Sequence, residues 1–347
     1  MKMLSFRQAL NEALHQEMAR DTSVFVYGLD VADHKRIFGS TAGLVEEFGP
    51  KRCFVTPISE DAMTGMGLGA ALCGLRPVHV HIRVDFMLLA MNQLANMIST
   101  CRYMSRGRLA APLTIRAVIG RGWGQSCQHS KSMHSIFAHI PGLKVVLPTT
   151  PRDAKALLAG AIRDNNPVMF LEHRWLYDIV DSVPEGELIE PLGHSHVLRE
   201  GSDVTVIAVS WMNVEALKAA QILKDRHGVE LHILDPSTIQ PLDVESLVQA
   251  VRRTGRLIIA DYDWTFCGFS AEVAALAAEH CFSELKAPIR RLGFAHTPCP
   301  TTRSLENAFY PAAPEIIRTV EDMLNLPPAD LSGEKFYSYE QMFKGPF

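Results

Sequence analysis

Residues 53–61 read Cys-Phe-Val-Thr-Pro-Ile-Ser-Glu-Asp and join an apolar run to a segment of small residues that extends to Ala71. The apolar run predicts a buried strand, and the small-residue segment predicts a tightly packed helix. Glu60 therefore stands where a strand gives way to a helix, and a carboxylate in such a cleft is a candidate proton-transfer group. Taken alone, Glu60 fits a helix cap equally well.

The same alternation continues outward in both directions along the chain. Short runs rich in β-branched residues predict strands at 24–27, 53–56, 78–82, 113–118, 144–147, 168–171, 204–209, 231–234, 257–260 and 288–292. Helical periodicity predicts helices at 4–19, 61–74, 86–104, 151–164, 212–226, 243–254, 268–282 and 313–325. Strands that alternate with helices predict an α/β fold with parallel sheets covered on both faces.

One stretch, residues 181–203, interrupts this rhythm with prolines and glycines among charged residues. Such a composition is typical of a link between domains. We expect two α/β domains at 1–183 and 203–330, a linker at 184–202 and a C-terminal tail at 331–347.

Composition excludes several classes of function. The net charge of −4 gives no electrostatic footprint for nucleic acid or an anionic membrane. The uncharged runs are shorter than the roughly 18 residues that a membrane span needs. The seven cysteines form no Cys-x-x-Cys pair, which favours reduced thiols in a cytoplasmic protein. The charged amphipathic N-terminus does not read as a signal peptide.

Two glycine-rich segments invite a nucleotide-binding interpretation. Gly65, Gly67 and Gly69 fall inside the predicted helix, whereas a dinucleotide fingerprint places its glycines in the turn. Because glycine in a helix costs about 1 kcal/mol relative to alanine, the three glycines predict that another backbone approaches closely, including one from a second subunit. The loop 120–124 fits a phosphate cradle, a substrate loop or a plain surface turn.

Several motifs recur in an order that resembles one known family. These motifs are Thr56-Pro57-Ile58-Ser59-Glu60, Asp85-Phe86, Asn92-Gln93, Tyr103-Met104-Ser105, Gln128-His129-Ser130, the segments 137–146 and 161–167, and, nearer the C-terminus, the segments 235–243 and 267–272. In them the chain resembles the beta subunit of the thiamine-diphosphate-dependent decarboxylase of 2-oxo acid dehydrogenase complexes (pyruvate, branched-chain or acetoin type), in the transketolase-like superfamily. The resemblance implies a pyrimidine-binding domain followed by a transketolase C-terminal domain.

The resemblance also implies roles for individual residues. Glu60 matches the acid that hydrogen-bonds the aminopyrimidine of thiamine diphosphate, and Phe86 matches the aromatic residue that stacks on it. His129 matches the active-site histidine that handles the substrate carboxylate or acyl transfer. Ile58, Asp30 and Gln93 fall at further cofactor-binding positions.

A metal-binding motif of the family is missing from this chain. The family holds the cofactor's diphosphate through Mg²⁺ with a Gly-Asp-Gly motif, which this sequence lacks. The resemblance therefore implies an alpha subunit that carries the motif, in an α2β2 heterotetramer, with a lipoyl acyltransferase as a further partner. The family's K⁺ segment matches Leu113, Ala161, Ile162, Asp164 and Asn166, although a helix end followed by a turn explains these residues equally well.

Some positions depart from the family pattern. Leu29 stands where the family has glutamate, Asn92 replaces an aspartate, and Trp123 occupies a position that is usually small. These departures predict an altered substrate wall beside a retained cofactor site. Two other functions stay open: a split transketolase-like subunit that transfers a two-carbon ketol unit between sugars, and a non-catalytic assembly subunit.

Overall fold

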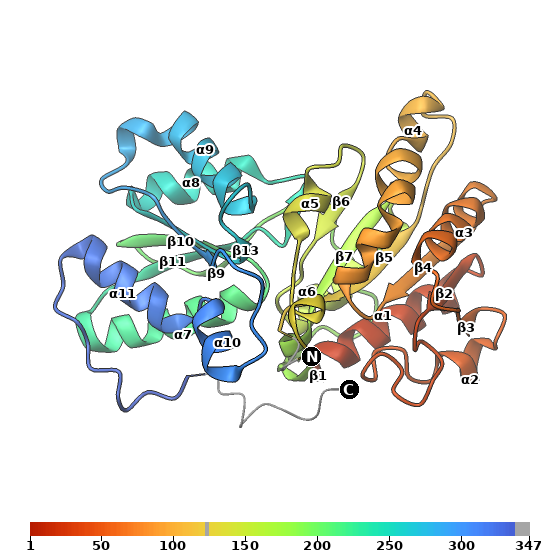
Figure 1. The fold of residues 1–347 in the computed structure, drawn as a ribbon, viewed down its shortest axis with the longest axis horizontal. Helices are drawn as coiled ribbons and strands as arrows, with labels where there is room; N and C mark the ends of the chain where they lie inside the picture. The colour runs from red at the N-terminus through yellow and green to blue at the C-terminus, as the bar shows by residue number, and fades with distance from the viewer. Residues whose placement is uncertain (122–124, 337–347) are drawn as a thin grey trace. The chain divides into compact units, whose positions relative to one another are not determined.

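The largest sheet in the described part of the chain contains seven strands in the order β12-β6-β7-β5-β4-β2-β3 (Figure 1). All neighbours in this sheet are parallel except β12 and β6, which are antiparallel. The strands are β2 (Val24–Gly28), β3 (Cys53–Val55), β4 (Arg76–His81), β5 (Thr114–Ile119), β6 (Lys144–Val146), β7 (Val168–His173) and β12 (Thr238–Gln240). A separate antiparallel pair joins β1 (Lys2–Ser5) to β8 (Val180–Val183).

The computed structural model describes residues 1–121 and 125–336. The chain divides into two compact units, and the first consists of Met1–Gly120, Ser132–Gly193 and Thr238–Pro241. The second contains Arg121–Lys131, His194–Ser237 and the residues from Leu242 onward. Of the predicted features, Gly122, Trp123 and Gly124 of the glycine-rich loop and residues 337–347 of the tail lie outside the described residues.

Helices cover the first sheet, and capping boxes begin two of them. They are α1 (Phe6–Arg20), α2 (Leu44–Phe48), α3 (Glu60–Leu72), η1 (Val84–Ala90), η2 (Gln93–Ile98), α4 (Cys101–Met104), α5 (His134–Ala138), α6 (Pro151–Arg163) and η4 (Arg174–Asp178). Ser5 and Thr150 form capping boxes at the starts of α1 and α6, which pack against each other.

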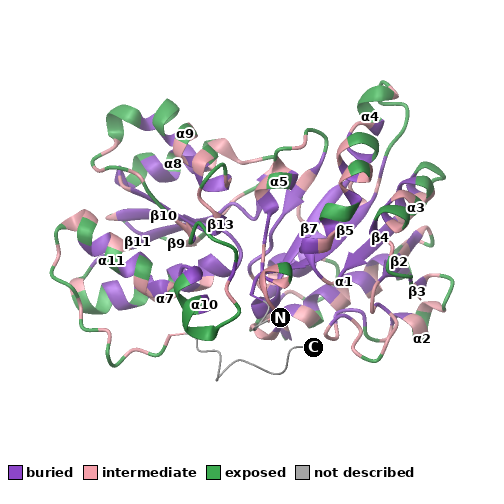
Figure 2. Ribbon diagram, in the orientation of Figure 1, coloured by how far each residue is buried: buried purple, intermediate pink, exposed green. Residues whose placement is uncertain are grey.

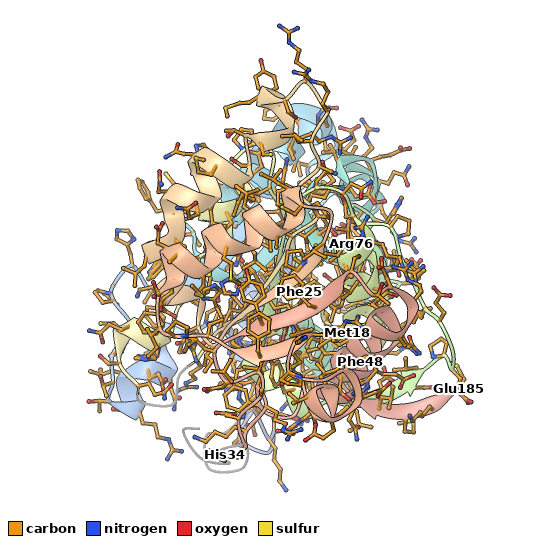
Figure 3. The ribbon with its side chains drawn as sticks, turned by 90° about the vertical axis from the view of Figure 1, so that its right-hand side faces the viewer. Met18, Phe25, His34, Phe48, Arg76 and Glu185 are labelled. Atoms are coloured by element: carbon orange, nitrogen blue, oxygen red, sulfur yellow. The ribbon has the colours of Figure 1, made fainter. Side chains whose placement is uncertain are left out.

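The strands of this sheet are the buried layer of the first unit (Figure 2). Every residue of β5 and β7 is buried, as expected for central parallel strands that are covered on both faces. At the edge of the sheet, Phe25 on β2 stacks on Phe54 of β3, with ring centroids 6.0 Å apart (Figure 3 labels Phe25).

The predicted single helix over 86–104 is wrong. The segment forms three pieces, in which the 3₁₀ helix η1 and the π-helical η2 precede the short α4. Its apolar periodicity is preserved across the pieces, since Val84, Met87, Leu94 and Ile98 are all buried. Changes of hydrogen-bond register of this kind are frequent at functional sites.

The second unit contains a five-stranded sheet in the order β14-β13-β10-β11-β9, which is parallel except for β9. Its strands are β9 (His196–Arg199), β10 (Val204–Ala208), β11 (Leu231–Asp235), β13 (Leu257–Trp264) and β14 (Arg290–Phe294). Its helices are η3 (Cys127–His129), α7 (Trp211–His227), α8 (Val244–Thr254), α9 (Phe269–Cys281), η5 (Phe282–Glu284), α10 (Arg303–Phe309) and α11 (Ala313–Leu324).

The predicted α/β class with two mostly parallel sheets is therefore confirmed. The stretch 184–202 contains β9, which pairs with β11 in the second sheet. All seven cysteines are free, and four of them are buried. Within the described part of the chain, no helix is both long enough and apolar enough to cross a membrane.

Candidate functional site

Parallel strands bring several predicted residues to one edge of the first sheet. Strands β2, β3 and β4 are parallel neighbours, so their carboxyl ends lie along the same edge. Asp30 follows β2, Glu60 follows β3, and Phe86 follows β4. Ligands of α/β proteins bind at this edge of the sheet.

Glu60 is the first residue of α3 and is only 8% exposed. Ser59, at the N-cap, makes no side-chain capping bond. Among the described residues, no hydrogen bond or ion pair involves the Glu60 carboxylate. A buried carboxylate is unfavourable without a partner, so Glu60 is suited to a hydrogen bond with a bound ligand.

Phe86 lies on η1, which packs against α3. Its side chain is half-buried, while Val84 and Met87 on the same helix are fully covered. This arrangement anchors η1 through its apolar residues and leaves Phe86 partly exposed.

The other predicted cofactor positions differ in their surroundings. Asp30 has a positive φ of 56°, and burial, followed by the nearby Asp33 carboxylate, raises the pKa of Asp30. Ile58 is 80% exposed. Gln93 donates from Nε2 to Asp61 Oδ2 at 3.3 Å. Asp30 and Gln93 are therefore held by protein contacts, whereas Ile58 presents an apolar side chain to solvent.

The glycines of α3 approach side chains instead of a second backbone. A Cβ at Gly67 would lie 2.2 Å from the Tyr27 hydroxyl, and one at Gly65 would lie 3.2 Å from Gln93 Oε1. Within the described residues, nothing comes within 4 Å of that position at Gly69. Within this chain, the neighbours at Gly65 and Gly67 are side chains of η2 and β2, which require small residues there. The approach of a backbone from a second subunit stays a prediction.

His129 belongs to the second unit, where it ends η3. Its Nδ1 lies 3.1 Å from the Gln125 carbonyl oxygen, and Ser130 Oγ donates to the Ser126 carbonyl at 2.8 Å. Because a carbonyl only accepts hydrogen bonds, Nδ1 carries the proton in this contact and Nε2 of the neutral ring is an acceptor. The turn thus fixes the tautomer of a histidine suited to proton transfer.

The residues of the predicted K⁺ segment surround one turn at the end of α6. The Leu113 carbonyl accepts a hydrogen bond from Val168, and the Ala161 carbonyl accepts one from Asp164. Arg76 (Figure 3) donates to the Ile162 and Asp164 carbonyls at 3.0 and 3.1 Å. Carbonyl oxygens have a second lone pair, so the donor set has the chemistry that a hard cation requires.

This turn also contains charges that compete with a cation. The Asp164 carboxylate pairs with Lys144, and it accepts a hydrogen bond from the Asn166 amide N–H at 2.8 Å. Burial acts to raise the pKa of Asp164, but the contacts with Lys144 and Asn166 outweigh it and lower the pKa below its ordinary value. The positively charged side chains of Arg76 and Lys144 therefore already order this turn.

A buried cluster that the sequence interpretation missed lies at the ends of β4, β5 and β7. Arg83 is 6% exposed and donates to the Gly120 carbonyl oxygen. A Cβ at Gly120, whose φ is +91°, would lie 2.3 Å from Nε2 of His173. Burial, and then the charges of Arg83 and Arg174, lower the pKa of His173 well below its ordinary value. The sequence did offer a signal for this cluster: a charged residue, Arg83, that follows an apolar strand and precedes Phe86 by three residues.

A second missed network is structural. Arg116 and Glu172 pair on adjacent strands β5 and β7 with Nε and Oε1 2.5 Å apart, and both side chains are 1% exposed. Tyr177 donates to Glu172 at 2.6 Å, and Arg116 donates to Ser40 at 3.0 Å. The ion pair compensates both buried charges, and the network ties β5 to β7.

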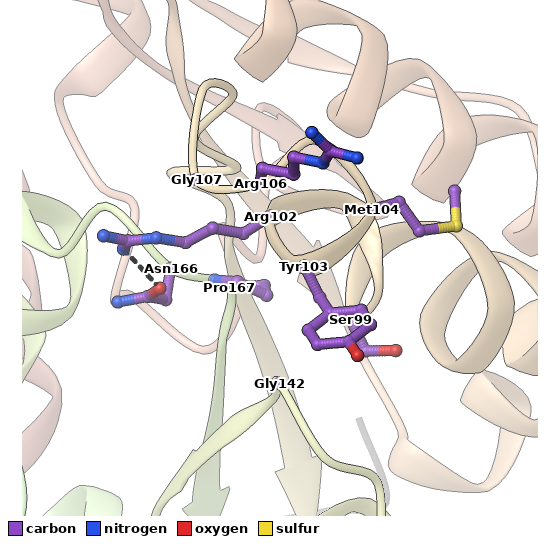
Figure 4. A pocket seen from close by; sticks show the side chains of 9 residues that line it. All are labelled: Ser99, Arg102, Tyr103, Met104, Arg106, Gly107, Gly142, Asn166 and Pro167. Atoms are coloured by element: carbon purple, nitrogen blue, oxygen red, sulfur yellow. Dashed lines mark hydrogen bonds between the residues drawn. The ribbon is translucent and has the colours of Figure 1, made fainter.

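The first unit contains an open cavity of about 770 Å³ (Figure 4). Its lining is Ser99, Arg102, Tyr103, Met104, Arg106, Gly107, Gly142, Asn166 and Pro167. Arg102 Nη1 donates to Asn166 Oδ1 at 2.7 Å across its wall. The cavity includes neither Glu60 nor Phe86, so it is separate from the predicted cofactor positions.

Comparison with known proteins assigns each half of the chain. Residues 2–179 match the transketolase pyrimidine-binding domain. Residues 193–316 match the transketolase C-terminal domain. Both domains are those that the sequence motifs predicted.

The similar curated proteins are beta subunits. The acetoin:2,6-dichlorophenolindophenol oxidoreductase subunit beta of Cupriavidus necator is 40% identical, over 91% of this chain and 96% of that protein. The 2-oxoisovalerate dehydrogenase subunit beta of Bacillus subtilis is 40% identical, over 89% and 95%. The pyruvate dehydrogenase E1 component subunit beta of Rickettsia felis is 37% identical, over 92% and 97%.

A solved structure has the same fold. A split-gene transketolase, described as an inactive beta4 tetramer, superposes with a TM-score of 0.75 over 93% of this chain and 99% of its own. Its sequence identity is 22%, so the likeness concerns the fold alone.

Proposed function

The chain belongs to the family of beta subunits of thiamine-diphosphate-dependent 2-oxo acid dehydrogenases, and we propose that it supplies the ring-activating acid for decarboxylation of a 2-oxo acid. The observation that carries the proposal is the position of Glu60. This buried carboxylate has no partner among the described residues and begins a helix at the carboxyl edge of the sheet. An acid in that environment suits a hydrogen bond to a ring nitrogen.

Each predicted site residue has a distinct task in the proposal. Thiamine diphosphate, when bound, supplies the electron sink for decarboxylation. Glu60 holds a proton at the pyrimidine nitrogen, and Phe86 orients the ring by stacking against it. Asp30, Ile58 and Gln93 complete the wall around the pyrimidine. His129 accepts or donates a proton at Nε2 while the acyl group moves to its acceptor.

A partner chain completes the cofactor site in this proposal. The sequence contains no Gly-Asp-Gly motif, so the Mg²⁺ that holds the diphosphate has its ligands on an alpha subunit. Exposed apolar side chains before α3 and on η1, η2 and α4 support a partner surface. They are Ile58, Leu88, Leu89, Met97, Tyr103 and Met104, with exposed fractions from 43% to 89%.

Further parts of the proposal rest on the donor groups and on the relatives. The carbonyls of Leu113, Ala161 and Ile162, with Asp164 and Asn166, would hold a structural K⁺. A small 2-oxo acid is the substrate, and a lipoyl group on an acyltransferase is the acceptor. We place the α2β2 enzyme in the cytoplasm, as the bacterial relatives suggest.

The test is reconstitution with an alpha subunit that carries Gly-Asp-Gly. Decarboxylation of pyruvate and of branched-chain 2-oxo acids, and carbon–carbon cleavage of acetoin, are measured with a dye acceptor and with a lipoyl domain. Activity that requires both chains and that disappears with Glu60→Gln supports the proposal. Ketol transfer between sugar phosphates, without 2-oxo acid decarboxylation, would contradict it.

A further inference from the structure

The loop that carries His129 is attached to the second unit at both ends. Before the loop, Arg121 is 5% exposed, and its Nε lies 2.9 Å from Oε2 of Glu306. Arg121 also donates to the side-chain oxygen of Asn307. Both partners lie on α10, so the ion pair joins the start of the loop to that helix.

After His129, the second attachment is Tyr310. Its hydroxyl donates to the Ser130 carbonyl oxygen at 2.9 Å, and Ser130 is 1% exposed. Burial, and then nearby groups that include Tyr262, raise the pKa of Tyr310 well above its ordinary value. The hydroxyl therefore remains a donor across the physiological pH range.

The two attachments meet on one aromatic ring. The Arg121 guanidinium lies over the Tyr310 ring, 5.3 Å from its centroid. That ring stacks on Tyr262 with centroids 5.0 Å apart and an interplanar angle of 9°, and it packs edge-on against Phe309. A ring that other rings hold on several sides is a rigid support.

Between the attachments, short hydrogen-bonded contacts hold the turn. The His129 amide donates to the Ser126 carbonyl at 3.2 Å, and its Nδ1 contacts the Gln125 carbonyl at 3.1 Å. Ser126 has a positive φ of 72°, which a serine adopts only when its surroundings impose it. The local turn and its two attachments together determine where the imidazole lies.

We propose that Tyr310 and Arg121 are positioning residues for the His129 imidazole: Tyr310 holds the turn through Ser130, and Arg121 supports the Tyr310 ring from α10. The proposal rests on the catalytic role assigned to His129 under the proposed function. Arg121 and Tyr310 act through the loop and do not touch the substrate. If the same contacts only held α10 in place, the variants would leave the His129 turn and side chain unchanged.

The first experiment follows hydrogen–deuterium exchange of the peptide 125–131 in the full chain and needs no activity. Tyr310→Phe keeps the ring and removes the hydrogen bond, and Arg121→Met removes the ion pair. We expect exchange of this peptide to speed up roughly five- to tenfold in each variant. Arg318→Met is the matched control, because Arg318 pairs with the buried Glu321 at 2.7 Å on the same unit. Unchanged exchange in both loop variants would overturn the proposal.

The second experiment measures the His129 side chain directly. Mass spectrometry of protein treated with diethyl pyrocarbonate gives the rate of modification at His129 alone. We expect both loop variants to change this rate at least threefold, roughly the effect of a lost hydrogen bond, whereas Arg318→Met leaves it unchanged. Equal rates in all four proteins would show that the attachments do not position the imidazole.

The third experiment uses the complex reconstituted with the alpha subunit. The loop variants should lower kcat for acyl transfer and alter the pH profile of kcat, with unchanged affinity for thiamine diphosphate. Arg121→Lys should restore part of the rate because it keeps the charge. Normal kcat and pH profile alongside faster exchange would contradict the link to His129. An inactive parent complex would instead count against the proposed function, and the first two experiments would still decide the positioning role.

Discussion

The two parallel sheets end differently at their carboxyl edges. In the first unit, the edge presents the buried Glu60 carboxylate and the half-buried Phe86 ring. In the second, the ends of β13 and β14 are filled by the protein's own rings: Tyr262 and Phe294 pack edge-on at 5.0 Å, and both contact Tyr310. This difference supports our proposals that the first edge receives a ligand and that the second supports the loop of His129.

The largest expected effect is a loss of turnover on changing Glu60 at the first edge. Glu60→Gln keeps the size of the side chain and removes its ability to hold a transferable proton. Turnover of the reconstituted complex should fall by about 10²–10⁴-fold, with an unchanged melting temperature. Glu272→Gln is the control, since Glu272 also lies in the first turn of a helix, α9, but is exposed. Equal activity of the two variants would refute the assignment of Glu60.

The next effect concerns the polar network beneath that edge. Glu172→Gln leaves Arg116 buried with an uncompensated charge, so the free energy of unfolding should fall by about 3–5 kcal/mol in denaturant titrations. Arg36→Met removes a pair with Glu46 on the surface and should change stability far less. Comparable decreases in the free energy of unfolding would mean that the buried network stabilises the first unit no more than a surface ion pair does.

A smaller effect depends on pH. Burial lowers the pKa of His79 to about 4, against an ordinary value near 6.5. The unfolded chain therefore binds the proton first as pH falls, so the stability contributed by the neutral ring is present above about pH 6.5 and is lost progressively toward pH 4. The total is on the order of 3 kcal/mol.

His79→Val tests this pH dependence. In the variant, the free energy of unfolding should fall less steeply between pH 7 and pH 4.5 than in the parent protein. His280→Val, at an exposed position on α9, should keep the parent's slope. A parental slope in the His79 variant would show that the ring is not buried in its neutral form.

The smallest expected effect is a difference in stability between substitutions at two glycines of α3, Gly67 and Gly69. Gly67→Ala places a methyl group against the Tyr27 hydroxyl and should destabilise the chain by about 1–3 kcal/mol. Gly69→Ala meets nothing within 4 Å in the described structure and should stabilise it by up to about 1 kcal/mol. Adding Tyr27→Phe to Gly67→Ala should cost less than the sum of the two single changes. Additive losses would contradict the steric explanation.

Local patterns predicted the helices and strands that surround the candidate site. The apolar run before Thr56 and the small residues after Glu60 became β3 and α3 because each pattern matches a single regular element. Periodicity did not reveal the breaks between η1, η2 and α4, since apolar spacing does not specify which carbonyl each amide contacts. The short strand β12 was missed because its three residues, Thr238–Gln240, pair with the distant β6.

Residues that act through long-range contacts also could not be predicted from a single sequence. The partners Arg121 and Glu306 are brought together by tertiary structure, and neither belongs to a recognisable local motif. The roles of Glu60, Phe86 and His129 came from a resemblance between ordered motifs, and they remain predictions. What the fold adds is a physical reason for Glu60: a buried acid at a sheet edge, with no partner in the described chain.

The most direct test of the central claim is calorimetric titration of thiamine diphosphate with Mg²⁺, first into this chain alone and then into its complex with a Gly-Asp-Gly subunit. If one chain supplies the acid and another the metal site, the complex should bind the cofactor tightly and the isolated chain should show no micromolar binding. Micromolar binding by the isolated chain would contradict the divided site.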